Sequence, residues 1–174
     1  MTDLATLSRA DRQQFVTLLS GIFEASPWVA EAAWARRPFA DLDALHGAMV
    51  GAVLGAARER QLALIRAHPD LAGTQAQQGR LSADSAAEQK SAGLERLSAD
   101  EFQRLTAHNA AYRAKFGFPF IICVRNHGKT GIFTAMEERL ANSPAAEFGL
   151  ALHEIYAIAR LRLEGLVDQV QRRP

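Results

Sequence analysis

The helical spacing of the apolar residues is the feature that most constrains the fold of this chain. They recur mostly at three- and four-residue intervals, and strand-like alternation is confined to residues 116–131, "FGFPFIICVRNHGKTG". With 174 residues, 48% of them hydrophobic, the chain has enough apolar material for one compact core. We therefore expect an all-α fold, a single-domain multi-helix bundle over residues 1–174, with one short non-helical segment, "FPFIICVR".

Start signals place the first helices. The first helix is expected to begin near Ser8 or Asp11, and its apolar face is expected to contain Phe15, Leu18, Leu19 and Ile22. Ser26 followed by Pro27 predicts the start of a second helix, because serine is a favoured N-cap and proline is tolerated at the first helical position.

The stretch "AHPDLA" is expected to end a third, longer helix over residues 41–67. Pro69 disfavours helical geometry in the residue before it, so the helix should stop at His68. A histidine at that place can move protons near neutral pH. It can equally cap the helix and interact with its dipole, and the local sequence leaves both interpretations open. Asp70 and Leu71 are expected to secure the turn.

Two capping boxes are predicted farther along, Ser85 with Glu88 and Ser98 with Glu101, each with a glutamate three residues after a serine. The first box would explain Ser85 and Glu88 without any ligand. It does not explain Gln89, whose side-chain amide can bind a carbonyl or a ring nitrogen.

The non-helical segment has backbone groups that need partners. Within a helical bundle they can be satisfied by a buried connection or by a polar, planar ligand, and both remain open. Cys123 lies between Ile122 and Val124, which favours burial as a small hydrophobe over work as a nucleophile. This segment is expected to line a pocket.

Two helices are expected near the C-terminus, over residues 129–141 and 144–171. Arg162 falls in the middle of an apolar stripe made of Ile155, Ile158, Ala159 and Leu166. A charge on such a face needs a partner, which can be a buried carboxylate, solvent reached by an extended side chain, or a ligand. Arg160 projects from another face and is more easily a surface residue.

Composition narrows the class of function. The formal net charge of +1 gives no overall attraction for nucleic acid or for an anionic membrane. A single cysteine excludes a disulfide framework, and the five scattered histidines do not favour a metal site, so none is expected. The opening "MTDLATLSRADRQQF" lacks a secretion signal pattern, and no apolar run reaches the ~20 residues that cross a bilayer, so a cytoplasmic protein is expected.

Four ordered motifs carry a family resemblance: "HPDLAG", "SAAEQ", "FGFPFIICVR" and "EIYAIARLRL". Together they resemble the 2-oxo-4-hydroxy-4-carboxy-5-ureidoimidazoline (OHCU) decarboxylase family, over nearly the whole chain. The resemblance implies an all-helical carboxy-lyase that uses no cofactor, acts on a small ureidoimidazoline, and is usually a homodimer. It implies the last step of the conversion of urate to (S)-allantoin in purine catabolism.

The resemblance also implies roles for residues. His68, Glu88 and Arg162 match the catalytic positions, although Arg160 remains an alternative to Arg162. The residues expected to bind the substrate are Pro69, Ser85, Glu88, Gln89, Phe120, Ile121, Ile122, Cys123, Val124 and Arg162. The ending "QRRP" lacks the fused hydrolase domain or peroxisomal tail of some relatives, which favours a free-standing cytoplasmic protein.

Two other functions remain open at this point. One is a helical ligand sensor or interaction module that kept the pocket without turnover. The other is a decarboxylase or lyase that acts on a related ureido or imidazoline acid. The presence of a histidine, a glutamate and an arginine together favours the enzyme, because a sensor needs no proton-transfer group.

Overall fold

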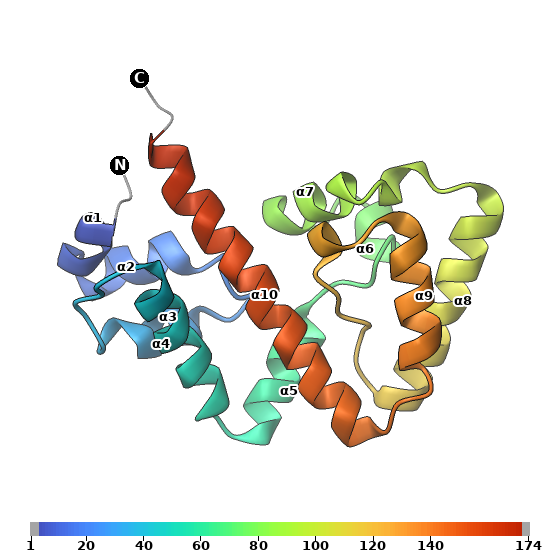
Figure 1. Cartoon of the computed structure of the whole chain (residues 1–174), viewed down its shortest axis with the longest axis horizontal. Coiled ribbons are helices and arrows are strands. Elements are labelled where there is room, and N and C mark those ends of the chain that lie inside the picture. Colours follow the sequence, from blue (N-terminus) through green and yellow to red (C-terminus); the bar gives the residue numbers. More distant parts are fainter. Residues whose placement is uncertain (1–3, 172–174) are drawn as a thin grey trace. The chain divides into compact units, whose positions relative to one another are not determined.

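The structure is a computed structural model that describes residues 4–171, of which 168–171 are described for the backbone only. Within that range it contains helices, turns and loops but no β-strand, so the all-α prediction is confirmed. The elements are shown in Figure 1. They are α1 (Leu4–Arg9), α2 (Arg12–Leu19), α3 (Pro27–Trp34), α4 (Leu42–Leu54), α5 (Arg58–Ala67), α6 (Thr74–Gln77), α7 (Ala83–Ser91), η1 (Leu94–Arg96), α8 (Ala99–Phe116), η2 (Val124–Asn126), α9 (Lys129–Arg139) and α10 (Pro144–Gln171).

The chain forms two compact units. The terminal unit comprises Met1–Ala67 and Tyr156–Pro174, and the central unit comprises His68–Ile155. Helix α10 belongs to both, because the division falls between Ile155 and Tyr156 within it. The expectation of a single domain over residues 1–174 stays a prediction.

The N-terminal region begins with one helix more than expected. Asp11 opens α2 with a capping box to Gln14, and α1 precedes it. Phe15 and Leu19 are buried on α2, but Leu18 is 36% exposed, so its placement on the core face was wrong. Ile22 is buried beyond the end of the helix. Helix α3 begins at Pro27, as predicted.

The long helix expected over residues 41–67 is two helices, α4 and α5. Asp41 caps α4 and accepts a hydrogen bond from the Ala44 N–H at 2.7 Å. The break follows Gly55, a residue with a high entropic cost within a helix. The Gln61 side-chain amide donates to the Val53 carbonyl at 2.9 Å, which satisfies an acceptor that an unbroken helix would use itself.

Helices α8, α9 and α10 follow the sequence signals closely. Ser98 and Glu101 form the predicted capping box of α8, with bonds of 3.2 and 2.8 Å. Gly117 ends α8 with a φ of +76°, a conformation that favours glycine. Helix α9 ends at Arg139, two residues before the predicted end, and α10 has the predicted bounds.

An aromatic cluster forms much of the central core and holds the non-helical segment. The Tyr112 ring contacts Phe116 and Phe120, with ring centroids 4.5 and 5.3 Å apart. Phe118 contacts Tyr112 and Phe148, at 6.0 and 6.3 Å. In Figure 1 the segment follows α8 and leads into α9, and these two helices contact each other. Residues 118–124 are all buried, so their backbone lies within the core.

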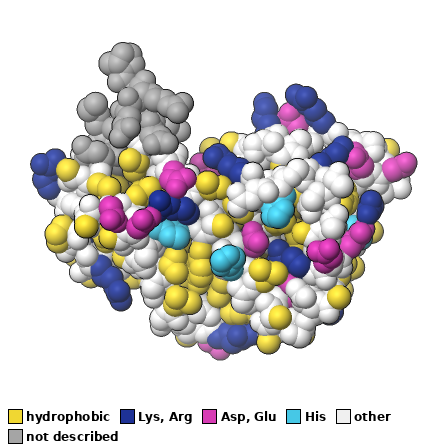
Figure 2. All heavy atoms as spheres, in the orientation of Figure 1, with side chains coloured by type: hydrophobic (Ala, Val, Ile, Leu, Met, Phe, Trp, Pro, Cys, Tyr) yellow, Lys and Arg dark blue, Asp and Glu magenta, His cyan; other side chains and the backbone are white. Residues whose placement is uncertain are grey.

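Charges on the face shown in Figure 2 are interspersed, with acidic and basic side chains side by side. Among the described residues, no helix is both long and apolar enough to cross a membrane.

Candidate functional site

His68 is buried, with 6% of its surface exposed, at the bend that follows α5. The helix ends at Ala67, as the proline predicted. The turn after it contains Ala72 at a φ of +47°, a left-handed conformation that residues other than glycine rarely adopt. Such a turn needs external support.

Gln89 of α7 provides much of that support. Its Oε1 accepts a hydrogen bond from the Ala72 N–H at 2.9 Å, and its Nε2 donates to the Asp70 carbonyl at 3.4 Å. The amide of Gln89 therefore does bind a carbonyl, and that carbonyl belongs to the chain itself. Gln89 is buried, with 8% of its surface exposed.

Helix α8 supports the same turn. Asn109 Nδ2 donates to the Leu71 carbonyl at 2.9 Å. Arg113 Nε lies 3.0 and 2.9 Å from the two carboxylate oxygens of Asp70. The prediction that Asp70 and Leu71 secure the turn is confirmed.

The predicted capping box of Ser85 and Glu88 is wrong. Helix α7 begins earlier, with Ser82 as its N-cap, and the Ser82 hydroxyl accepts from the Ser85 N–H at 3.2 Å. Ser85 is buried and Glu88 is half-buried, both within the helix. Positions three and four residues apart share one side of a helix, so Ser85, Glu88 and Gln89 lie together. Capping no longer accounts for Ser85 or Glu88.

Helix α7 lies against the end of the non-helical segment. Helix α7 contacts η2, which begins at Val124. Burial raises the pKa of the Cys123 thiol, and the carboxylates of Glu154 and Glu88 raise it further. The expectation that Cys123 is a buried apolar residue is confirmed, since only 1% of its surface is exposed.

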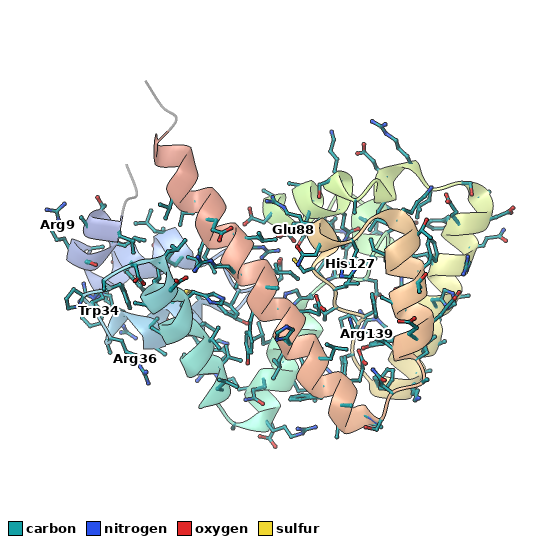
Figure 3. All side chains as sticks on the ribbon, in the orientation of Figure 1. Arg9, Trp34, Arg36, Glu88, His127 and Arg139 are labelled. Carbon is teal, nitrogen blue, oxygen red and sulfur yellow. The ribbon has the colours of Figure 1, made fainter. Side chains whose placement is uncertain are left out.

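Two charged residues hold the backbone of that segment. Arg139 Nη1 donates to the Ile121 carbonyl at 2.7 Å, and the guanidinium carbon lies 4.4 Å from the centre of the Phe120 ring. The Cys123 N–H donates to Glu154 Oε2 at 2.8 Å. Figure 3 labels Arg139 on α9, whose guanidinium holds the segment, and Glu88 on α7.

Arg139 is itself part of a buried polar network. Its Nε donates to Glu147 Oε1 at 2.7 Å, and Asn142 Nδ2 donates to Glu147 Oε2 at 2.8 Å. The Tyr112 hydroxyl also donates to Glu147, whose side chain is fully buried. Burial raises the pKa of Tyr112 strongly, and the bond to Glu147 adds to the shift.

Sequence reasoning missed Arg139, Glu147 and Glu154. Glu154 lies within the quoted "EIYAIARLRL" motif, but its importance depends on a contact with the distant Cys123 backbone. Arg139 and Glu147 are charged residues at core positions of their helices. The rule that identified Arg162 in the sequence could have identified them as well, because a charge on an apolar face requires a partner.

Arg162 lies in the terminal unit and is buried, with 9% of its surface exposed. Its Nη1 donates to the Gly21 carbonyl at 2.9 Å and to Glu24 Oε2 at 3.0 Å. A buried ion pair is therefore present, as one interpretation of the sequence expected. Arg160 pairs with Asp43 and Glu164, and its side chain is 32% exposed.

The structure thus brings most of the predicted site residues into the central unit. His68, Pro69, Ser85, Glu88, Gln89 and residues 120–124 all belong to it, and Arg162 belongs to the terminal unit. The apolar stripe around Arg162 is buried at Ile155, Ile158 and Ala159, and Leu166 is half-buried.

A cavity of about 490 Å³ opens behind the turn, in the central unit. Its wall includes Ala72, Gln89, Lys90, Leu94 and Phe102. Over the described residues, no group of His, Cys, Asp or Glu side chains has the arrangement of a metal site.

Comparison with known proteins points to one family. The OHCU decarboxylase profile matches residues 8–164. A 2-oxo-4-hydroxy-4-carboxy-5-ureidoimidazoline decarboxylase of Haloferax volcanii is 43% identical over 160 residues, covering 92% of this chain and 93% of that protein. The protein of the same name from Halalkalicoccus jeotgali is 42% identical, covering 92% of this chain and 89% of that protein.

Solved structures agree on the fold. A crystal structure of (S)-allantoin synthase aligns with a TM-score of 0.75 and 29% identity, covering 96% of this chain and 55% of that one. A crystal structure of OHCU decarboxylase in the presence of (S)-allantoin aligns with a TM-score of 0.68 and 22% identity, covering 91% of this chain and 99% of that one.

Proposed function

Because this chain belongs to the OHCU decarboxylase family, we propose that His68, Glu88 and Arg162 carry out that family's reaction in it. The chain is a carboxy-lyase that converts OHCU to (S)-allantoin, the last step from urate to allantoin. The substrate roles of individual residues are our proposal. The observation that carries them is that Ser82 is the N-cap of α7, which leaves the buried Ser85 and the half-buried Glu88 inside the helix without a capping role.

The substrate supplies its own electron sink. One ring carbon holds both the carboxylate and a hydroxyl, and the neighbouring ring carbon is part of a C=N bond. When the bond to the carboxylate breaks, carbon dioxide leaves and the electron pair moves into the ring toward that nitrogen. The ring nitrogen that receives the pair takes up a proton from solvent. The hydroxyl then loses its proton to become a carbonyl, and one proton is added to the neighbouring carbon. The protein must orient the ring and deliver that proton to one face.

His68 is the proposed proton-transfer residue. Its imidazole is buried at the end of a helix, and the following turn is held in a left-handed conformation by Gln89. A side chain fixed in this way can take the hydroxyl proton and return a proton to the ring carbon. Pro69 directly follows and is proposed to contact the substrate.

Ser85, Glu88 and Gln89 are proposed to hold the ureido and ring N–H groups. A carboxylate is a strong acceptor for such donors, and a hydroxyl or an amide oxygen can add a second bond. Gln89 has a further part, because its amide already holds the turn that follows His68. The side-chain oxygen of Gln89 has two lone pairs, so it can accept a second hydrogen bond besides the one from the Ala72 N–H.

Residues 120–124 are proposed to form the opposite wall. Their backbone supplies donors and acceptors, and their buried apolar side chains remove water from the carboxylate. Arg162 is proposed to bind an oxygen of the ureido group or the ring and to offset negative charge. Its ion pair with Glu24 supplies a partner for the guanidinium before the substrate binds.

The test generates the substrate in situ from urate with urate oxidase and hydroxyisourate hydrolase, and follows circular dichroism. Unaided decay gives racemic allantoin, so an enzyme is detected by rapid formation of an optically active product. We expect His68→Asn to slow formation of the optically active product by ~10²–10⁴-fold, the usual contribution of general acid–base catalysis. His153→Asn, at an exposed histidine of α10, is the matched control. Activity of the His68 variant within tenfold of the parent would contradict its role.

We also propose that the chain acts in the cytoplasm as a homodimer. The support is the family resemblance and the match along most of each relative's length. Sedimentation equilibrium at micromolar concentration should give twice the chain mass of 19.0 kDa. A concentration-independent monomer mass would contradict the dimer.

A further inference from the structure

We propose that Arg139 and Glu154 are positioning residues that fix the peptide groups on both sides of Ile122 and so present the Ile122 N–H and C=O to the substrate. This inference rests on the proposed function, since it assigns the substrate-binding backbone to two side chains that hold it. Neither residue needs to touch the substrate.

The two hydrogen bonds fall on alternate residues of the segment. Arg139 of α9 binds the Ile121 carbonyl at 2.7 Å, and Glu154 of α10 binds the Cys123 N–H at 2.8 Å. Both peptide groups next to Ile122 are trans, and in a trans peptide the C=O and the N–H point in opposite directions. The Ile122 N–H therefore points away from the Arg139 guanidinium, and the Ile122 C=O points away from the Glu154 carboxylate.

Ile122 is buried, with 4% of its surface exposed. Among the described residues, no protein group is within hydrogen-bonding geometry of its N–H or its C=O. Buried backbone groups need partners. An N–H and a C=O on one residue match the adjacent acceptor and donor of a planar ureide, which is the chemistry that the substrate carries.

Arg139 is held in place by a buried network. The charge of Arg139 is balanced by Glu147, which also accepts from Tyr112 and Asn142, and all four belong to the core or its margin. The Phe120 ring stacks under the guanidinium at 4.4 Å. A segment held by such a network needs little further ordering when a ligand binds, which favours affinity.

Glu88 approaches the same segment from α7. Its carboxylate lies close enough to Cys123 to act on the thiol, and α7 contacts η2 directly after the segment. The Ile122 peptide and the Glu88 carboxylate thus belong to one part of the central unit. A ligand there meets a backbone donor and acceptor from one element and a carboxylate from another.

The test compares Glu154→Gln with Glu154→Leu by steady-state kinetics. The glutamine oxygen can still accept from the Cys123 N–H, whereas leucine keeps the approximate volume and cannot. We expect Glu154→Leu to raise KM by about tenfold or more, the order of one lost hydrogen bond, with a smaller change in kcat. Glu154→Gln should stay within about threefold of the parent. Glu138→Leu, at an exposed acid of α9, controls for the loss of a surface charge.

Amide hydrogen exchange provides a second readout that does not depend on turnover. The Cys123 N–H should exchange slowly in the parent and in Glu154→Gln, and faster in Glu154→Leu. If glutamine and leucine impair KM equally, or if neither does, the positioning role is overturned. If the parent itself forms no optically active product, the proposed function fails instead, so the two failures are distinguishable.

Discussion

Two non-helical segments of the central unit, the turn after His68 and residues 118–123, are held by different kinds of group. The turn after His68 is fixed by the neutral side-chain amides of Gln89 and Asn109, helped by an ion pair near the surface. The segment 118–123 is fixed by the charges of Arg139 and Glu154. In both segments the side chains bind backbone groups at about 3 Å. The two kinds of side chain differ in which group loses its partner when the side chain is removed.

Removing a neutral amide leaves one unpaired backbone group, whereas removing one member of a buried ion pair leaves an uncompensated charge. An uncompensated charge costs much more free energy than an unpaired backbone group in a medium of low dielectric constant. The turn should therefore tolerate substitution better than the segment. The carboxylate of Glu147 is the point at which this difference is greatest, because its side chain is fully buried.

Glu147→Leu is expected to have the largest effect on stability. It leaves the Arg139 guanidinium buried without its carboxylate, which should lower the free energy of unfolding by about 3–5 kcal/mol. Urea denaturation measures this. Glu138→Leu, on the exposed side of α9, should change the free energy by less than about 0.5 kcal/mol. A loss below about 1 kcal/mol for Glu147→Leu would show that the network is not a strong anchor.

Alkaline titration probes Tyr112 of this network, together with Tyr156, without mutation. The chain has two tyrosines, and burial raises the pKa of both Tyr112 and Tyr156 above the ordinary value of 10.0. Because the folded state favours the neutral phenols, their contribution to stability is complete below pH 10 and is lost as the pH rises above it. The ultraviolet absorbance of the phenolate should therefore appear at a higher pH in the folded protein than in the unfolded chain. Titration of a full tyrosine near pH 10 in the folded protein would contradict this.

Gln89→Leu is expected to have an intermediate effect on the turn. It leaves the Ala72 N–H without its acceptor, which should cost about 1–3 kcal/mol in the free energy of unfolding. It should also lower kcat, because the turn that orients His68 is released. Gln77→Leu serves as the control, since Gln77 is exposed and its bond to the Ala72 carbonyl is long at 3.4 Å. Equal effects of the two variants would remove the special role of Gln89.

Arg113→Ala should have the smallest effect. Arg113 pairs with Asp70, and the arginine side chain is 44% exposed, so solvent screens the interaction. The expected loss in the free energy of unfolding is about 0–1 kcal/mol, and it should shrink further as salt is added. A salt-independent loss of more than about 2 kcal/mol would place this pair with the buried network rather than with the surface.

Much of the fold follows from local sequence signals. The starts of α3, α8 and α10 depend on residues close together in the chain, and so they are predictable. The break between α4 and α5 was not predicted, because the hydrogen bond of Gln61 to the Val53 carbonyl, which accompanies the break at Gly55, is not visible in the local pattern. For α7, the spacing of Ser85 and Glu88 predicted the wrong cap, because the helix is capped by Ser82.

The candidate site rests on sequence motifs, and the roles of its residues stay predictions. Motifs identified the segments around His68, Glu88 and residues 120–124, which the structure places in the central unit. They did not identify Arg139 or Glu154, whose roles depend on contacts with distant backbone groups. Residues that act through a tertiary contact leave no spacing pattern in the sequence.

The thiol of Cys123 is expected to react slowly with oxidants. Its thiol is buried beside two carboxylates, so it stays protonated near neutral pH, and the protonated form is a poor nucleophile toward peroxide or alkylating reagents. As the chain has no second cysteine, it also has no partner for an internal disulfide. A cysteine introduced at an exposed position would therefore be the preferred site of attachment for a dye or a spin label, with the native thiol left in place.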